Sequence, residues 1–450
     1  IAGGAFFVTI CAQERAVQVV TLTTLYDLAD RQSQKVRVSE VALRAADEGV
    51  AAAKSALLPS VDLNLQGSYT GNALMLSRGF SSSGTTDYIV PGVGTVPVAN
   101  GKQDTPHWGN SFTAQVSQVV YAGGAIRSGI RMAELSKEMA ELDVEKNRQE
   151  VRFLLTGYYL DLCKLDNQME VVRQNIALTQ KEIEQMKARR GEGTVLQNDI
   201  TRYEFQLQSL ELTLTKLKDA STVINHQLVT TLHLPEQTVI VPDKNELDTE
   251  INALSAIAAQ ETWQQTAADN NLGIRQATVA TNLAEQKVKQ VKAESLPSVA
   301  VVAENQLYGP YTQDLIPKDC NVNVWFVGIG VKFSIGSLWK NKHNIRKARI
   351  EHQQSQEALA LAHEEVENGV QANYTNLLTS YTEVKTQQKQ VELANQNYSV
   401  VQNRYQNELA LLTDMVDASN MKLSAEMALV NARIGMLYNF YKLKYVTNTL

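Results

Sequence analysis

The sequence predicts an internally duplicated α+β membrane protein, built from long antiparallel coiled-coil helices and four strands long enough to cross a bilayer. Three observations predict this fold class. Apolar residues recur about every 3.5 residues over very long stretches, and four short stretches alternate apolar and polar side chains. The second half of the 450-residue chain also repeats the pattern of the first.

The longest helical stretch runs from Ile126 to about Arg190 and contains no proline. Its apolar seam alternates steps of four and three residues, as in a coiled coil. The seam consists of Tyr158, Leu162, Leu165, Met169, Val172 and Ile176. A helix of this length would extend on the order of 90 Å, several times the length of an ordinary globular helix.

The same spacing returns three times along the chain. The second seam consists of Tyr203, Leu207, Leu210, Leu214, Leu217, Ile224 and Leu228. The third consists of Val370, Tyr374, Leu377, Tyr381, Val384 and Val391, and the fourth of Leu423, Met427, Val430, Ile434, Leu437 and Tyr441. Ordinary core packing would explain any one seam, but four seams of this length predict two antiparallel helical hairpins.

Shorter elements precede the first hairpin. Residues 21–57 predict one helix that ends before Pro59, because a residue that precedes proline avoids the helical conformation. Alternating side chains then predict strands at about residues 60–71 and 112–121. The connection between them, residues 72–110, is rich in Gly, Ser and Thr and predicts an exposed loop.

The start of the chain predicts export. Residues 1–12 are apolar and small and lead into the polar Gln13, which is typical of the rear part of a cleaved secretory signal. Lipidation of Cys11 is an alternative, although Ile10 is not the small residue that such a site requires.

The second half predicts strands at about residues 298–308 and 323–335. All four strands have about the length that a tilted strand needs to cross a membrane. Aromatic residues near strand ends fit interface positions: Trp108, Phe112, Tyr121, Tyr308, Tyr311 and Trp339. A soluble sheet would show the same alternation, and the export signal favours the membrane.

An internal duplication organises these elements. Residues 41–61 match residues 279–299 at one constant spacing, and residues 130–199 match residues 345–414 at another. The change of spacing lies within the loops that join the strands, where length is free to vary.

Two structural repeats are therefore predicted. The first covers residues 13–235, with a helical tip at about 190–199. The second covers residues 236–450, with a tip at about 405–417.

The composition excludes several functions. A net charge of −6 leaves no basic surface for nucleic acid. The three cysteines lack the spacing of a disulfide framework or zinc site, and the residue four positions after His363 is Glu367 rather than a second histidine. Since no catalytic residue, metal site or cofactor site can be assigned, an enzyme is not expected.

Assembly with further copies of the chain is expected from the strand count. Four strands cannot close a barrel, and open strand edges are not tolerated within lipid. Two chains would provide about eight strands and a barrel filled by side chains, whereas three would provide about twelve strands and a lumen.

The chain resembles the TolC-like outer-membrane efflux ducts of Gram-negative bacteria over nearly its whole length. The resemblance rests on residues 58–61, Leu-Pro-Ser-Val, on their repeat at 296–299, and on the glycine pair at 123–124. It also rests on the tips, where this family has a glycine six residues before an aspartate. Gly193 stands in this way before Asp199.

The resemblance implies a homotrimer with a 12-stranded outer-membrane β-barrel continuous with a periplasmic α-helical tunnel. A mixed α and β belt is expected where the helices break, near Pro235 and Pro242. The implied function is that of an exit duct in a tripartite efflux or type I secretion system, which passes small molecules, drugs or proteins outward. The implied partners are a periplasmic adaptor (membrane fusion) protein, an inner-membrane pump and outer-membrane lipid.

The resemblance also implies roles for residues at the tips. Tyr405 and Asp199 match residues that tie neighbouring coils together and hold the entrance shut. Ala410 replaces the arginine that usually assists them, a role that Arg404 or Arg190 could take. The residues expected to contact the adaptor are Gly193, Asn198, Glu408 and Leu409, with Glu408 in the place of the second glycine.

Two acidic residues of the second tip, Asp414 and Asp417, are spaced three apart and therefore lie on one helix face. Threefold symmetry would place their carboxylates around one axis, which would favour cations and permit block by divalent ions. The alternative is that these acids only complement the positive end of the helix dipole.

A second class of function stays open at this stage, a non-catalytic periplasmic coiled-coil scaffold or binding protein with soluble sheets. The polarity of the strands separates the two classes. In a duct the apolar strand face meets lipid, whereas in a scaffold it packs against a partner layer.

Overall fold

The computed structural model describes residues 17–71, 73–75, 85–92, 94–99, 101–103, 106–191, 193, 195–243, 249, 251, 258–311, 319–407 and 409–450. The expectations for residues 1–12, which include Cys11, and for Glu408 lie outside this set. The chain forms two compact units. One contains residues 1–47, 136–282 and 354–450, and the other contains residues 48–135 and 283–353.

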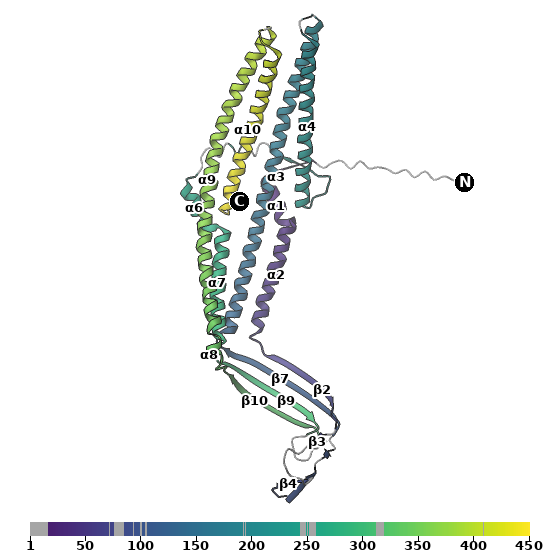
Figure 1. Cartoon of the computed structure of the whole chain (residues 1–450), viewed down its shortest axis with the longest axis vertical. Coiled ribbons are helices and arrows are strands. Elements are labelled where there is room, and N and C mark those ends of the chain that lie inside the picture. Colours follow the sequence, from purple (N-terminus) through teal and green to yellow (C-terminus); the bar gives the residue numbers. More distant parts are fainter. Residues whose placement is uncertain are drawn as a thin grey trace, which may run out of the picture. The chain divides into compact units, whose positions relative to one another are not determined.

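The four predicted long helices are present, and most of each lies in the first unit. They are α3 (Ala125–Gly191), α4 (Gln197–Thr231), α9 (Lys342–Gln406) and α10 (Leu412–Val446). Figure 1 shows α3 beside α4 and α9 beside α10, with both interhelical turns at the same end. No helix in the described part of the chain has both the length and the apolar character that a membrane span requires.

Contacts between the helices confirm two antiparallel hairpins. Lys187 of α3 forms an ion pair with Glu204 of α4 at 3.0 Å, on either side of the first turn. Asn439 of α10 donates a hydrogen bond of 2.5 Å to Ser380 of α9. A shared core then joins the hairpins, and its fully buried members include Leu155, Tyr159, Leu228, Leu377, Leu437 and Leu443.

The predicted seam of α3 faces this interior. Leu162, Leu165, Met169 and Val172 are buried, and only the two outer members of the seam, Tyr158 and Ile176, are half-buried. Burial of one apolar stripe on each long helix stabilises the hairpins far more than helix propensity could.

The single helix predicted over residues 21–57 is wrong. The structure has α1 (Leu22–Gln32) and α2 (Gln34–Ser55), separated at Ser33, whose ψ of 126° is extended. The same break at Asn271 separates α6 (Gln260–Asn270) from α7 (Leu272–Ala293). There the Asn271 side chain accepts the N–H of Gly273 at 2.8 Å, which shows how such side chains compete with the helix for backbone groups.

A small parallel pair of strands adjoins the helices of the first unit. Strand β1 (Val17–Val20), which the sequence analysis missed, pairs with β8 (Val239–Pro242). Asn225 of α4 anchors β8, because its side chain accepts the N–H of Ile240 at 2.8 Å and donates to the carbonyl of Thr238 at 2.9 Å. This pair lies where the resemblance implied a mixed α and β belt.

The second unit contains a four-stranded antiparallel sheet. Its strands are β2 (Ser60–Tyr69), β7 (Trp108–Ala122), β9 (Ser298–Gly309) and β10 (Val322–Lys332), in the order β10-β9-β7-β2. The register aligns the apolar side chains of neighbouring strands, as in the pairs Val61 with Val116, Leu65 with Phe112, Val301 with Ile329, and Ala303 with Val327. Because side chains alternate along a strand, these residues share one face.

That apolar face is exposed in the chain. The exposed fraction is 78% for Leu65, 73% for Ile329 and 67% for Val331. Among the residues that the structure describes, the outer strands β2 and β10 each have a partner strand on one side only. A water-soluble sheet would normally cover such a face and protect such edges.

The exposed loop predicted over residues 72–110 is wrong in part, because the region contains further strands. They are β3 (Ala73–Met75), β4 (Thr85–Val90), β5 (Gly94–Ala99) and β6 (Gly101–Gln103). Strands β4 and β5 form a hairpin across a turn in which Gly92 has a φ of +84°. Glycine adopts that conformation without steric strain, and the β-branched residues beside it favour extended structure.

Candidate functional site at the helical tips

The ends of the two hairpins meet in a compact apolar core, which we call the tip core. It draws residues from all four long helices and from the first turn: Ile183, Met186, Val195, Ile200, Tyr203, Tyr398, Leu412, Met415 and Ala418. The turns and the first residues of α4 and α10 are therefore held in place by packing of both hairpins.

The first turn contains a glycine with left-handed backbone. Gly193 has a φ of +82°, and its N–H donates to the carbonyl of Arg190 at 3.0 Å. Val195 packs into the tip core two residues later, while Asn198 is exposed. The backbone at Gly193 thus allows the chain to reverse between α3 and α4, each of which packs one face into the tip core.

The second turn closes differently. Arg404 donates a side-chain hydrogen bond of 3.2 Å to the carbonyl of Leu409, whose N–H bonds back to the Arg404 carbonyl at 2.8 Å. Arg404 therefore stabilises its own turn. Leu409 is 68% exposed and is not part of the tip core.

Helices α4 and α10 begin in the same way. Each has a leucine as the capping residue, Leu196 or Leu411, followed three residues later by an aspartate, Asp199 or Asp414. The Asp414 carboxylate accepts the N–H of Leu411 at 3.1 Å. Asp414 thus satisfies one backbone donor that the helix start leaves free.

The structure brings Asp199 and Tyr405 together. Both line a pocket at the tip, with Arg189 and Arg202 also at its wall. Burial, then the nearby Asp199 carboxylate, raises the pKa of the Tyr405 hydroxyl, and Arg189 opposes this rise. Two cations, Arg189 and Arg202, thus lie at the pocket that holds this pair. The role suggested for Arg404 or Arg190 between neighbouring coils stays a prediction.

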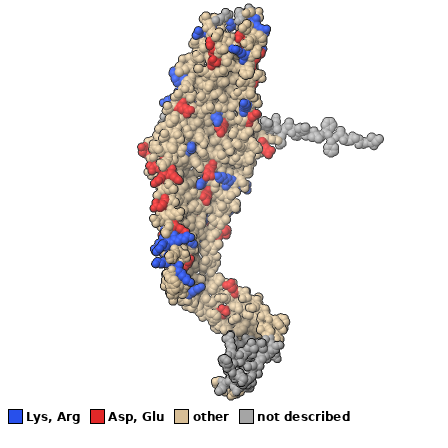
Figure 2. Space-filling view, in the orientation of Figure 1, with Lys and Arg blue, Asp and Glu red and all other residues tan. Residues whose placement is uncertain are grey.

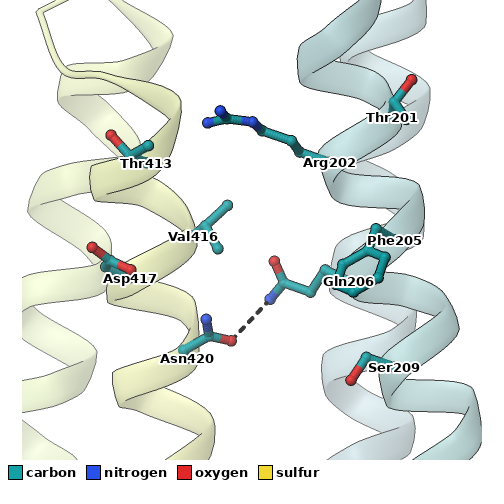
Figure 3. A pocket seen from close by; sticks show the side chains of 9 residues that line it. All are labelled: Thr201, Arg202, Phe205, Gln206, Ser209, Thr413, Val416, Asp417 and Asn420. Atoms are coloured by element: carbon teal, nitrogen blue, oxygen red, sulfur yellow. Dashed lines mark hydrogen bonds between the residues drawn. The ribbon is translucent and has the colours of Figure 1, made fainter.

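Asp417 lies elsewhere, in a groove between α4 and α10 of about 570 Å³. Figure 3 shows Arg202 and Phe205 on the α4 side and Val416 and Asp417 on the α10 side. Between the two helices, the side chain of Gln206 donates a hydrogen bond of 3.4 Å to the side chain of Asn420. The two acids proposed for one ring, Asp414 and Asp417, therefore have different surroundings in the chain.

Sequence reasoning missed a polar ladder along the buried face of α3. Gln168, Asn175 and Glu182 recur every seven residues, and all are buried. Their partners lie on the other hairpin: Asn431 at 2.7 Å, Glu426 at 3.1 Å and Gln402 at 2.6 Å, respectively. The heptad spacing of these polar residues in the sequence could have shown it.

Glu182 places a buried carboxylate among the tyrosines of the tip. Burial first, then Glu182, raises the pKa of both Tyr203 and Tyr398. The buried hydroxyl of Tyr203 has no hydrogen-bond partner among the described residues. Both tyrosines are consequently held in the neutral form.

The described residues show no arrangement for metal chemistry. No group of three or more His, Cys, Asp and Glu side chains among them is placed to hold a metal ion. Cys163 is buried and Cys320 is exposed, and neither forms a disulfide with another described residue.

The chain combines two long helical hairpins with packed tips and an antiparallel sheet whose apolar face is uncovered. These features define a class of membrane channels with extended helical hairpins. The solved outer membrane protein VceC of Vibrio cholerae has a similar fold, with a TM-score of 0.71 and 16% sequence identity over 95% of each chain.

Sequence comparisons agree with this class. Outer membrane protein TolC of Salmonella enteritidis is 20% identical over 441 residues, which cover 96% of this chain and 83% of that protein. Outer membrane efflux protein BepC of Brucella suis is 21% identical over 432 residues, covering 96% and 86%. The outer membrane efflux protein family matches residues 25–232 and 263–448, and the chain belongs to this family. The resemblance and the outer-membrane location inferred from the sequence are thereby confirmed.

Proposed function

We propose that this chain is the outer-membrane exit duct of a tripartite efflux system and that it acts as a homotrimer. The observation that carries the proposal is the sheet of the second unit, with its exposed apolar face and its two unpaired edges. Lipid would cover the face, and strands of neighbouring copies would cover the edges.

Three copies meet these requirements better than two. Three four-stranded sheets supply about twelve strands, enough for a water-filled lumen, whereas about eight strands are filled by their own side chains. The opposite face of the sheet is suited to a lumen because it carries polar residues in register, such as Asn64 with Thr113 and Gln115 with Glu304.

The proposed duplication into residues 13–235 and 236–450 is supported by matched helix lengths. Helices α1 and α6 both have 11 residues, α2 and α7 both have 22, and α4 and α10 both have 35. Helices α3 and α9 have 67 and 65. Two equal halves suit a tunnel in which each chain contributes two similar hairpins.

The tips are the proposed entrance. The exposed Asn198 and Leu409 and the turn at Gly193 are available to a periplasmic adaptor. The same role is proposed for Glu408 from the sequence alone. Asp199 and Tyr405 are proposed to hold neighbouring coils together in the closed state. An inner-membrane pump would drive transport, and the duct would perform no chemistry.

Membrane extraction and native mass measurement test the proposal together. The chain should leave washed outer membranes only with detergent, and its mass in detergent should be that of a trimer. Release by high salt alone would favour the periplasmic scaffold. A stable monomer or dimer in detergent would contradict the trimeric duct.

A further inference from the structure

A group of exposed basic residues lies where the β9–β10 hairpin joins its helices. One segment is the end of α7, which leads into β9, and the other is α8 (Ser337–Lys340) with the start of α9, which follow β10. We call this group the basic cluster, and it consists of Lys287, Lys289, Lys292, Lys340, Lys342, Arg346, Lys347 and Arg349. Figure 2 shows a dense group of blue side chains in the region of α8.

Packing fixes the two segments to each other. The side chain of Asn341 is buried and donates to the carbonyl of Val291 at 2.7 Å and to the hydroxyl of Ser295 at 3.1 Å. Val288 and Val291 of α7 pack against Ala348 of α9. The basic side chains are therefore presented by one rigid junction of two helices.

Much of the positive charge is not neutralised within the chain. Lys289 pairs with Glu285 at 3.0 Å, and Lys347 pairs with Glu351 at 3.5 Å. Among the described residues, no carboxylate lies within ion-pair distance of Lys340, Lys342 or Arg346. Uncompensated like charges repel one another, so a junction that needed only stability would not require them.

The first repeat carries only part of this charge. Positions 54, 127 and 131, which match Lys292, Lys342 and Arg346, are also basic, whereas the other matching positions are not. Where the second repeat has Lys340, Lys347 and Arg349, the matching positions 125, 132 and 134 carry Ala, Met and Glu. Where it has Lys287 and Lys289, positions 49 and 51 carry Gly and Ala. The same helix junction thus forms with far fewer positive charges.

Apolar side chains border the basic cluster on the side of the sheet. Ile335 is 61% exposed, Leu338 is 55% exposed and Trp339 is 62% exposed, and they lie between β10 and the cluster in the sequence. An exposed tryptophan between an apolar strand face and basic residues is the arrangement expected at a membrane surface.

We infer that the basic cluster binds the phosphate groups of anionic phospholipids in the periplasmic leaflet of the outer membrane. This inference rests on the proposed function, because it requires the β9–β10 strands to lie in lipid. Lys and Arg side chains would contact the phosphates, while Trp339 and Leu338 would reach the acyl boundary. The result would be an anionic lipid layer retained around the second repeat, which would fix the depth of the sheet in the bilayer.

Native mass spectrometry of the detergent-solubilised assembly tests this inference with phosphatidylglycerol and phosphatidylcholine as probes. The wild type should retain phosphatidylglycerol in preference to phosphatidylcholine. The variant K342Q/R346Q should bind phosphatidylglycerol about tenfold more weakly, and K340Q/K342Q/R346Q/K347Q more weakly still. The matched control is R127Q/R131Q, which changes the equivalent positions of the first repeat and should alter binding by less than about twofold.

Two outcomes would overturn the inference. One is equal phosphatidylglycerol retention by the wild type and the quadruple variant. The other concerns an added polyglutamate peptide as a third probe. If the wild type binds this peptide in preference to phosphatidylglycerol and the quadruple variant does not, an acidic protein segment is the partner. The mass of the assembly in the same spectra reports folding of each variant. A trimer mass with equal lipid retention would contradict the lipid inference alone, whereas the mass of a monomer or dimer would contradict the trimer proposal.

Discussion

The carboxylate of Asp414 lies 3.1 Å from the backbone nitrogen of Leu411 and accepts its hydrogen bond at the start of α10. One of the two acids proposed for a selectivity ring therefore also caps a helix. Asp417, one turn later, is exposed and lines the groove beside α4. Substitutions at the two positions can therefore distinguish helix capping from a role in ion selection.

The cap predicts a local stability effect for Asp414. Replacement by alanine should remove about 1 kcal/mol from the stability of the first turn of α10, because the Leu411 N–H loses its partner. Amide exchange at Leu411 should accelerate roughly fivefold. Asp417→Ala is the control and should leave that amide unchanged; equal acceleration in both variants would mean that general charge loss, not the cap, matters.

The proposed acidic ring predicts a change in conduction. In planar bilayers, Asp417→Ala should weaken cation preference and block by divalent ions, because three carboxylates leave the entrance while the cap stays intact. The double variant Asp414→Ala with Asp417→Ala should weaken both further. Unchanged selectivity in the double variant would leave the acids with a structural role alone.

The tip tyrosines predict resistance to alkaline ionisation. Burial and Glu182 raise the pKa of Tyr203 and Tyr398 above the ordinary value of about 10. Since the folded pKa exceeds the unfolded one, their stabilising contribution is complete below about pH 10 and is lost as pH rises toward the folded pKa.

Tyrosinate absorbance checks this expectation. At about pH 11, Tyr203→Phe should leave the absorbance of the folded protein unchanged but lower that of the urea-unfolded protein. A fall in the folded protein would show that Tyr203 ionises like a free tyrosine.

Replacement of glycine by alanine should lower stability at Gly193, where the backbone is left-handed, and raise it at Gly49. Gly193→Ala should cost roughly 1–2 kcal/mol at the tip, because φ is +82°. Gly49→Ala, inside α2 with open space around it, should stabilise its helix by about 0.5–1 kcal/mol. The rate of tryptic cleavage after Arg190 should rise only in Gly193→Ala, and an equal rate in both would refute the turn argument.

The connection between β2 and β7 predicts tolerance to deletion. Its described strands pair with one another. The pairing of β2 with β7 already ends at Tyr69 opposite Trp108 and at the bond from the Thr70 N–H to the His107 carbonyl. Removal of residues 73–103 should therefore leave the trimer mass unchanged. Loss of the trimer would place this region within the assembly contacts.

Periodicity alone predicted the elements that repeat a simple pattern. The proline-free stretch from Ile126 to about Arg190 predicted α3 to within one residue of each end, and the seam at Leu162, Leu165 and Met169 predicted that it is helical. The alternation at Val61, Leu63 and Leu65 likewise predicted a strand with one apolar face.

Single side chains limited the prediction elsewhere. The breaks at Ser33 and Asn271 interrupt otherwise continuous helical patterns, and nothing in the apolar spacing marks them. They arise because one residue turns to extended backbone while its neighbours stay helical. Periodicity averages over several turns, so a one-residue break is invisible to it.

The sequence by itself determined the long hairpins, the two-faced strands, and the glycine turn that leads to Asp199. Only the tertiary structure decided which polar groups meet: Asp199 beside Tyr405 and Arg189, and Glu182 with Gln402 of the other hairpin. The physical reason is that a repeat fixes the face a residue occupies on its own helix. Its partner depends on how four helices pack. That packing is determined jointly by residues that lie far apart in the chain.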